Sequence, residues 1–413
     1  MKTSDKNEYF KRTRSATGFL AAGLLILLLP GCAEITPEPE KTEPYYEITD
    51  GSLIYDYDPS TRVGDKVFGT IVADFENDNP GRNSHGGPVA LELANGNLVA
   101  FHSNATGHSV DGWSEYAIST DGGRIWDMYN KFMYSYDTYR SNPKVAAWVE
   151  EGLVTSKGTV LLFISHMGNP VRGGGEEGRT NLGFMRSYDN GDTWSEYQPL
   201  DGSFAGYPAA IAVEGKTNYL LVDSNEGPHV LYVSTDDGRS WRKRSTLPLE
   251  DSRWYGALCV MEDGSLLAGA YECVDGDEHY FFYCISEDEG HTWGDEKSVY
   301  LDKRIRNPEL AYLDGRYYLH GRAGHGGEYG RSFVLYQSED GENWGEGTII
   351  SSLAKRSLDG YSKNVIINKY KQDVPNELMV LYSIAYDYDD HEGPYRSTNS
   401  YVFFIRPEPG HEN

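Results

Sequence analysis

Five copies of one short motif are spread along this chain and constrain its fold more than any other feature. Four copies fit the pattern SxDxGxxW, at residues 119–126, 187–194, 234–241 and 286–293, and a fifth copy, at residues 338–344, is one residue shorter. The starts of the copies lie 68, 47, 52 and 52 residues apart. A period near 50 residues is typical of a β-propeller, in which every blade is a small antiparallel sheet. The motif spacing therefore predicts an all-β propeller.

Each copy of the motif is expected to form a turn. An Asp side chain can accept backbone amides of a tight turn, Gly supplies a positive φ, and Trp fills the space between neighbouring sheets. Two β-like runs joined by a Gly turn precede the motif, as in VALELANGNLVAFHS at residues 89–103. A sixth unit without the motif begins at residue 363, and the early run KVFGTIVAD is expected to complete its sheet. The prediction is six four-stranded antiparallel blades within residues 63–410.

The N-terminus reads as an export signal. Basic residues precede an apolar run at residues 18–32, which is too short for the roughly 20 residues of a spanning helix. Leu29-Pro30-Gly31-Cys32 resembles a bacterial lipobox, so residues 1–31 are predicted to be a lipoprotein signal peptide and Cys32 the lipidated residue. The acidic, Pro/Glu-rich residues 32–62 then form a stalk. These features predict an exported protein, tethered to a bacterial membrane by its lipid alone and facing the periplasm or the cell surface; the alternative is a plain secretory signal.

The net charge of the chain argues against nucleic acid as a partner. The 413 residues include 63 acidic and 37 basic side chains, which gives a formal net charge of −26. Binding of nucleic acid is not expected, because a grip on phosphates needs clustered Lys and Arg. Hydrophobic residues make up 39 % of the chain, which is enough for a packed core, and we expect a monomer.

No metal site or cofactor is predicted. The chain has no HExxH, paired CxxC, EF-hand, Walker or dinucleotide-binding spacing. An acidic cluster within residues 387–391 is interpreted as a solvated loop, and a structural Ca²⁺ is the alternative at that place. Three cysteines remain beyond the lipobox, Cys259, Cys273 and Cys284, and they allow one disulfide at most.

The repeats resemble the Asp-box, or BNR, repeats of the sialidase superfamily of six-bladed propellers, over nearly the whole mature chain. The resemblance implies a nucleophilic Tyr in a YS motif at the start of the last blade, and Tyr361 occupies that place. It also implies three Arg that bind a sugar carboxylate, but only Arg331 stands at such a position, and His85 lies in the stretch where the first Arg is expected. The general acid of that superfamily precedes the first Asp-box, and Asp111 is our choice for it. The chain therefore resembles a divergent member with an incomplete arginine triad.

Side chains at the starts of the inner strands are expected to converge at one mouth of the central channel, namely His85, Tyr207, Tyr255, Glu309 and Tyr361. The first hypothesis is an exo-acting glycoside hydrolase for an acidic, sialic-acid-like or uronate sugar of an extracellular glycan. In it Tyr361 attacks the anomeric carbon with help from Asp359 or Glu309, Asp111 protonates the leaving oxygen, and the sugar is bound by Arg306, Arg322 and Arg331.

Two other functions stay open at this point. A polysaccharide lyase would remove a proton beside a uronate carboxylate with His85 or His102, protonate the leaving group with a Tyr, and neutralise the carboxylate with Arg or Asn104. A surface lipoprotein that binds glycans without turning them over would use the abundant Tyr and Trp for stacking on sugar rings. All three hypotheses share a glycan or polysaccharide as the partner.

Overall fold

The computed structural model describes the strand-forming part of the chain. The described residues are 46–47, 62–63, 66–73, 88–106, 111–123, 125–142, 144–169, 179–200, 206–223, 227–272, 279–323, 333–353, 361–371, 373–386 and 397–405. They all belong to one compact unit, Pro44–Asn413. The predicted signal peptide, Cys32 and most of the predicted stalk lie outside the described residues. No helix among the described residues is long and apolar enough to cross a membrane.

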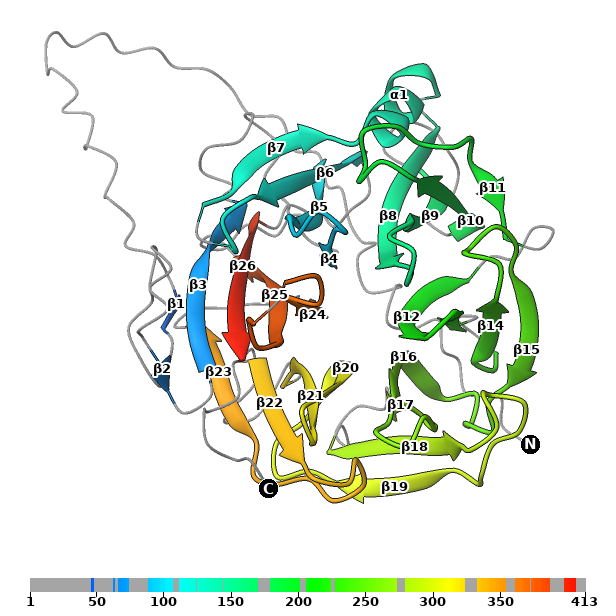
Figure 1. Ribbon diagram of the computed structural model, residues 1–413, viewed down its shortest axis with the longest axis vertical. Helices are drawn as coiled ribbons and strands as arrows, with labels where there is room; N and C mark the ends of the chain where they lie inside the picture. The colour runs from blue at the N-terminus through cyan, green and yellow to red at the C-terminus, as the bar shows by residue number, and fades with distance from the viewer. Residues whose placement is uncertain are drawn as a thin grey trace, which may run out of the picture. The chain divides into compact units, whose positions relative to one another are not determined.

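Five blades are each built from four consecutive antiparallel strands, with a further short strand on the fifth (Figure 1). The first is β4 (Val89–Glu92), β5 (Leu98–Thr106), β6 (Asp111–Ser119) and β7 (Asp127–Lys131). The second is β8 (Val145–Val154), β9 (Val160–Gly168), β10 (Arg179–Ser187) and β11 (Gln198–Pro199). The third is β12 (Tyr207–Glu214), β13 (Thr217–Asp223), β14 (Val230–Ser234) and β15 (Arg242–Thr246). The fourth is β16 (Arg253–Val260), β17 (Leu266–Glu272), β18 (Tyr280–Ser286) and β19 (Lys297–Tyr300). The fifth is β20 (Arg306–Leu313), β21 (Arg316–Arg322), β22 (Phe333–Ser338) and β23 (Thr348–Leu353), with β1 (Tyr46–Glu47) at its edge.

The sixth sheet is a composite of the two ends of the chain. It consists of β24 (Ser362–Ile367), β25 (Glu377–Tyr386) and β26 (Ser397–Ile405), followed by β3 (Lys66–Ala73) and β2 (Arg62–Val63). Strand β3 pairs antiparallel with β26, so the early run KVFGTIVAD closes the last sheet as predicted. Six blades were predicted; the structure has five complete four-stranded blades that are continuous in sequence, and this composite sheet makes a partial sixth. One helix, α1 (Met133–Ser141), was not predicted and connects the first two blades.

The innermost strands surround a common axis. Contacts join β4 to β8, β8 to β12, β12 to β16, β16 to β20, β20 to β24 and β24 back to β4. The ring is therefore closed, and Figure 1 shows it viewed along this axis. The prediction of an all-β propeller with four-stranded antiparallel blades is confirmed. We call the end of the channel at which the inner strands begin the mouth.

The SxDxGxxW motifs form the turns between the third and fourth strands, as their composition predicts. In the fourth blade, Asp288 accepts the Thr292 amide at 2.8 Å and the Ser286 hydroxyl at 2.9 Å. Gly290 has a φ of 79°, which Gly adopts without strain. Hydrogen bonds from the amide and hydroxyl of Thr292 lower the pKa of Asp288 to about 2. The aspartate is thus a structural acceptor in its ionised form.

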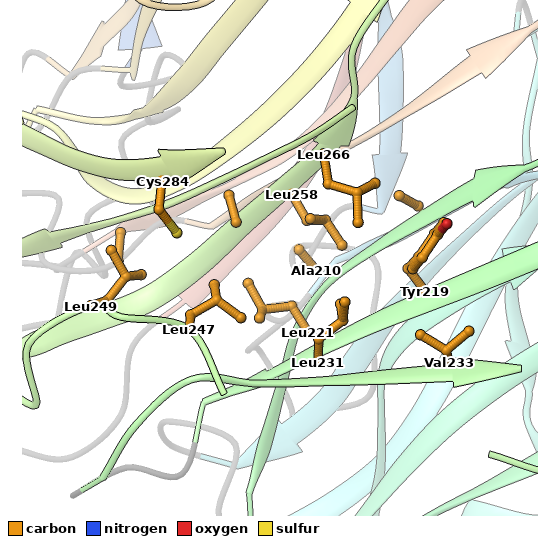
Figure 2. Close-up of a cluster of buried hydrophobic side chains, with 13 residues drawn as sticks. Ala210, Tyr219, Leu221, Leu231, Val233, Leu247, Leu249, Leu258, Leu266 and Cys284 are labelled. Atoms are coloured by element: carbon orange, nitrogen blue, oxygen red, sulfur yellow. The ribbon is translucent and has the colours of Figure 1, made fainter. Parts of the chain in front are cut away.

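Apolar layers between the blades hold the ring together. Figure 2 shows the layer between the third and fourth blades, where Leu221 and Leu231 meet Leu258 and Leu266. Full burial of each such side chain contributes roughly 1.5–3 kcal/mol. The motif tryptophans extend these layers: Trp241 belongs to the layer between the second and third blades, with its ring 5.2 Å from that of Phe163.

The cysteines described by the structure are packing residues. Cys284 lies in the apolar layer of Figure 2, and Cys259 lies in the next layer. Both are free thiols, and burial raises the pKa of each to about 12. Cys273 and Cys284 flank a loop in the sequence and could have paired across a hairpin, but Cys284 is a free thiol in the structure, so this disulfide is not formed.

Candidate functional site

A small pocket of about 20 Å³ opens at the mouth, where the inner strands of the third to sixth blades begin. Its lining combines aromatic, amide and charged side chains with backbone of the third to sixth blades and of Pro88, just before the first blade: Pro88, Tyr207, Ala209, Tyr255, Gly256, Asn307, Pro308, Glu309, Tyr361, Ser362 and Lys363. A small concave site with a few converging polar groups is the usual form of a binding or active site.

Irregularities in the inner strands shape this pocket. The pairing register shifts between Trp254 and Ala257 in β16 and between Arg306 and Glu309 in β20. Within these shifts Tyr255 and Asn307 have φ angles of 51° and 49°. This left-handed backbone conformation costs a residue other than Gly about 1–3 kcal/mol in free energy. Bulges of this kind commonly redirect side chains beside active sites. Here the two strained residues are also two that line the pocket.

Three tyrosines form one wall. The ring of Tyr255 lies 5.4 Å from that of Tyr207 and 6.4 Å from that of Tyr361, and it stacks at 6.1 Å on the buried ring of Tyr271. The backbone amide of Tyr255 donates to Asp223 at 3.1 Å, which fixes this strained residue. Burial, with a further contribution from Tyr255, raises the pKa of Tyr361 well above its usual value. The Tyr361 phenol is therefore protonated at neutral pH, and a nucleophilic role would require a base.

Two arginines flank the tyrosine wall. Arg306 and Arg322 are direct partners in the β20–β21 pairing, so their positive charges lie close together. The Arg306 guanidinium lies 5.4 Å from the ring of Tyr271 and donates to its hydroxyl at 3.3 Å, and the Arg322 guanidinium lies 5.5 Å from the ring of Tyr361. Guanidinium groups match carboxylate or sulfate oxygens in a bidentate manner. This side of the pocket is suited to an anionic group.

The floor of the pocket is ionic, which the sequence did not reveal. The ammonium of Lys363 forms ion pairs with Glu151 at 2.5 Å and Glu309 at 2.7 Å and donates a hydrogen bond to the carbonyl oxygen of Ala209 at 2.7 Å. Burial alone would lower the pKa of Lys363, but Glu151 and Glu309 together raise it. Burial raises the pKa of Glu309 to about 8 and also raises that of Glu151. The cluster thus combines one permanent positive charge with two carboxyl groups that resist ionisation.

The structure brings together four of the five residues expected at the mouth: Tyr207, Tyr255, Glu309 and Tyr361. The fifth, His85, lies outside the described residues, as do Arg331 and Asp359. Arg306 and Arg322 adjoin the pocket through the tyrosine rings.

Three other candidates do not line this pocket. Burial within β5 lowers the pKa of His102 to about 4, and Asn104 is buried on the same strand. Asp111 begins β6 at the mouth end of the first blade and accepts a hydrogen bond from Asn169 at 2.8 Å. Its neighbours at residues 107–110 lie outside the described part of the chain.

Metal ligation finds no support in the described residues. Within those ranges, no group of three or more His, Cys, Asp or Glu side chains could hold a metal ion. The acidic cluster at residues 387–391 lies outside them.

Comparisons with known proteins agree with this fold. No family model matches the chain. A xyloglucanase from Paenibacillus sp is 26% identical over 252 residues, which are 60% of this chain and 22% of the xyloglucanase, so the chain spans about a fifth of that relative's length. The Hadza microbial sialidase Hz136 superposes with a TM-score of 0.60 at 16% identity, covering 81% of this chain and 68% of the sialidase. A Penicillium chrysogenum α-L-arabinanase complexed with arabinobiose gives 0.52 at 14% identity, covering 82% of this chain and 98% of the arabinanase.

These similarities define the class of the protein as a sialidase-like β-propeller. Its relatives in sequence and in fold include glycoside hydrolases.

Proposed function

We propose that this chain is an exported carbohydrate-active enzyme that hydrolyses a glycosidic bond at an acidic sugar of an extracellular glycan. One observation carries the proposal: Tyr361 and Glu309 line one pocket of a sialidase-like propeller, with the Arg322 guanidinium 5.5 Å from the Tyr361 ring and Arg306 as the strand partner of Arg322. A phenol, a carboxyl group of raised pKa and guanidinium groups are together the groups needed to attack an acidic sugar and to bind its anion.

In the proposed reaction the Tyr361 oxygen attacks the anomeric carbon while its proton passes to the Glu309 carboxylate. The bond from the anomeric carbon to the leaving oxygen breaks, and that oxygen receives a proton from a donor at the mouth; Asp111, at the mouth end of the first blade but outside the pocket lining, is the candidate. Water then attacks the anomeric carbon and gives one proton to the group that had protonated the leaving oxygen, while Glu309 returns its proton to the Tyr361 oxygen as the glycosyl–tyrosine bond breaks. The raised pKa of Glu309 suits this role, because a base with a higher pKa is a better acceptor for a phenolic proton.

Binding of the sugar is assigned to the flanking groups. Arg306 and Arg322 would hold the carboxylate, and their local positive charge opposes the net charge of −26 that repels anionic polymers. The rings of Tyr207 and Tyr255 offer a face for the sugar ring.

The experiment is a panel of sialylated, uronate-containing and neutral glycans, with products read by mass. We expect hydrolysis, seen as products that gain one water, and a loss of at least about 100-fold in kcat for Tyr361→Phe. Tyr300→Phe, which alters an exposed tyrosine of β19, is the matched control and should keep wild-type activity. Full activity of Tyr361→Phe would refute the nucleophile.

Other outcomes of the same panel identify the alternatives. Products that lack the added water and carry a double bond would show a lyase. Saturable binding of one glycan without any product would show a binding protein.

The cellular location belongs to the same proposal. We propose that the chain is anchored through lipidated Cys32 and otherwise stays off the membrane as a monomer. The expected result for Cys32→Ser is release of the protein from the membrane fraction with its activity intact. A variant that stays membrane-bound would argue against the lipid anchor.

A further inference from the structure

Lys363 ties four blades together directly below the pocket. It comes from β24 of the sixth sheet, and its ammonium forms ion pairs with Glu151 on β8 and Glu309 on β20 and donates to the carbonyl oxygen of Ala209 on β12. The side chain of Lys363 is only 7% exposed, so these bonds replace its solvation by water. The bridge fixes Glu309 relative to strands on the far side of the channel.

The charges in this bridge do not balance when both carboxyls are ionised. Two carboxylates that share one ammonium in a buried site leave an excess negative charge, and such a pair tends to keep one proton. Glu151 also accepts the Gly152 amide at 3.1 Å, which favours its ionised form. The retained proton therefore belongs on Glu309, the member of the pair that lines the pocket. The pKa of Glu309, raised to about 8, agrees with this assignment, and the charge of Glu151 adds to the rise.

Near Glu309 lie the neutral His320 and two tyrosines, while the charged Arg306 and Arg322 lie on the tyrosine side of the pocket. His320 is the direct partner of Glu309 across the β20–β21 pairing. The two ring nitrogens of His320 bond to the Ser362 hydroxyl at 2.9 Å and to the Asn364 amide at 3.0 Å, and burial lowers the pKa of His320 to about 3. Tyr207 and Tyr361, which share the pocket, are phenols. The charges of Lys363 and Glu151 are thus the ones that act on Glu309 most directly.

We propose that Lys363 and Glu151 are positioning residues that hold the Glu309 carboxyl at the pocket floor and set the pH at which it can take up the proton of Tyr361. The inference rests on the proposed function. In the step concerned, the O–H bond of Tyr361 breaks, the proton joins a Glu309 oxygen, and the ammonium of Lys363 keeps its charge and its contacts with Glu151, Glu309 and Ala209.

Glu151→Gln tests this role, because Glu151 does not line the pocket and the amide oxygen of Gln can still accept from Lys363. Removal of the repelling charge should let Glu309 ionise at lower pH. We expect the acid limb of kcat/KM against pH to move down by about one unit or more, with KM on the plateau unchanged. Glu151→Asp, which retains the charge, should return the limb toward its wild-type position. Glu262→Gln, a change at an exposed carboxylate of the β16–β17 turn, is the control and should leave the profile in place.

A second readout does not depend on activity. A carboxyl whose pKa is raised by folding contributes stability below its unfolded pKa, and this stability is lost as pH rises through the folded value. The urea midpoint of the wild type should therefore fall as pH rises toward about 8, a fall that Glu309→Gln should reduce. In Glu151→Gln the same fall should end at a lower pH.

The outcomes separate the two proposals. If Tyr361→Phe is inactive but Glu151→Gln shifts neither profile, the positioning role is overturned and the proposed function stands. If the stability profile shifts although no glycan is cleaved, the charge coupling is supported and the proposed function fails. If Glu151→Gln does not fold, the wild-type and Glu309→Gln stability profiles decide, and identical profiles would overturn the inference.

Discussion

Substitution of Lys363 by Met should destabilise the protein in a pH-dependent way. The change removes the ammonium that bonds Glu151 at 2.5 Å and Glu309 at 2.7 Å, and it leaves two buried carboxyl groups without a counter-ion. Breaking a buried ion pair from one side typically costs about 3–5 kcal/mol. Near pH 8, where at least Glu151 is ionised in the wild type, we expect Lys363→Met to lower the free energy of unfolding by this full amount, about 3–5 kcal/mol.

At pH 5 the same substitution should cost less. Both carboxyls can then take up a proton in the variant, so the loss falls to that of hydrogen bonds to buried groups, about 1–3 kcal/mol. Urea unfolding followed by tryptophan fluorescence at pH 5 and pH 8 gives the two values. A control that also replaces Glu151 and Glu309 with Leu should recover most of the loss, because apolar residues can substitute for a buried ionic cluster. A loss below about 1 kcal/mol at pH 8, or an equal loss at both pH values, would refute the reasoning.

Three further predictions concern the blades. Trp241→Ala should lower the free energy of unfolding by about 3–5 kcal/mol in urea, whereas Trp254→Ala, at a residue 36% exposed, should lose far less; equal losses would contradict the packing role. Because the pKa of Asp288 is depressed to about 2, its stabilising effect is present above its unfolded value near 3.9 and is lost as pH falls toward 2; Asp288→Asn should make acid unfolding, followed by circular dichroism, less steep, and an unchanged slope would count against this. Thiol reagents at pH 8 should label Cys259 and Cys284 only after unfolding, since burial raises both pKa values to about 12; rapid labelling of the native protein would show that these thiols are accessible.

The sequence predicted those parts of the fold that depend on local chemistry. Asp288 and Gly290 have the residue types that their turn requires, so the motif could be read as a turn without any tertiary information. The regular spacing of such turns then fixed the propeller. Helix α1 was missed because its nine residues are mostly polar and show no apolar periodicity, so its position depends on packing against its neighbours.

The residues of the candidate site also fall into those that the sequence could predict and those that it could not. Tyr207, Tyr255, Glu309 and Tyr361 could be grouped because a propeller brings the starts of its inner strands together. Lys363 and Glu151 could not, since a charged residue in a strand reads as exposed until its buried partners are known. Asn307 was missed for another reason: its positive φ arises from a bulge in β20 that no local motif announces.

The ionic floor also bears on how a substrate reaches the pocket. Below it lies a second, larger cavity of about 620 Å³, whose lining includes Gly152, Leu310 and Asn364, each one residue further along its strand than Glu151, Glu309 and Lys363. The bridge therefore lies between the two cavities, and its hydrogen bonds join strands on opposite sides of the channel. A polymer could not thread through the propeller without breaking the bridge. Under the proposed function the sugar must enter and leave by the mouth, which favours action at the end of a glycan chain over cleavage within it.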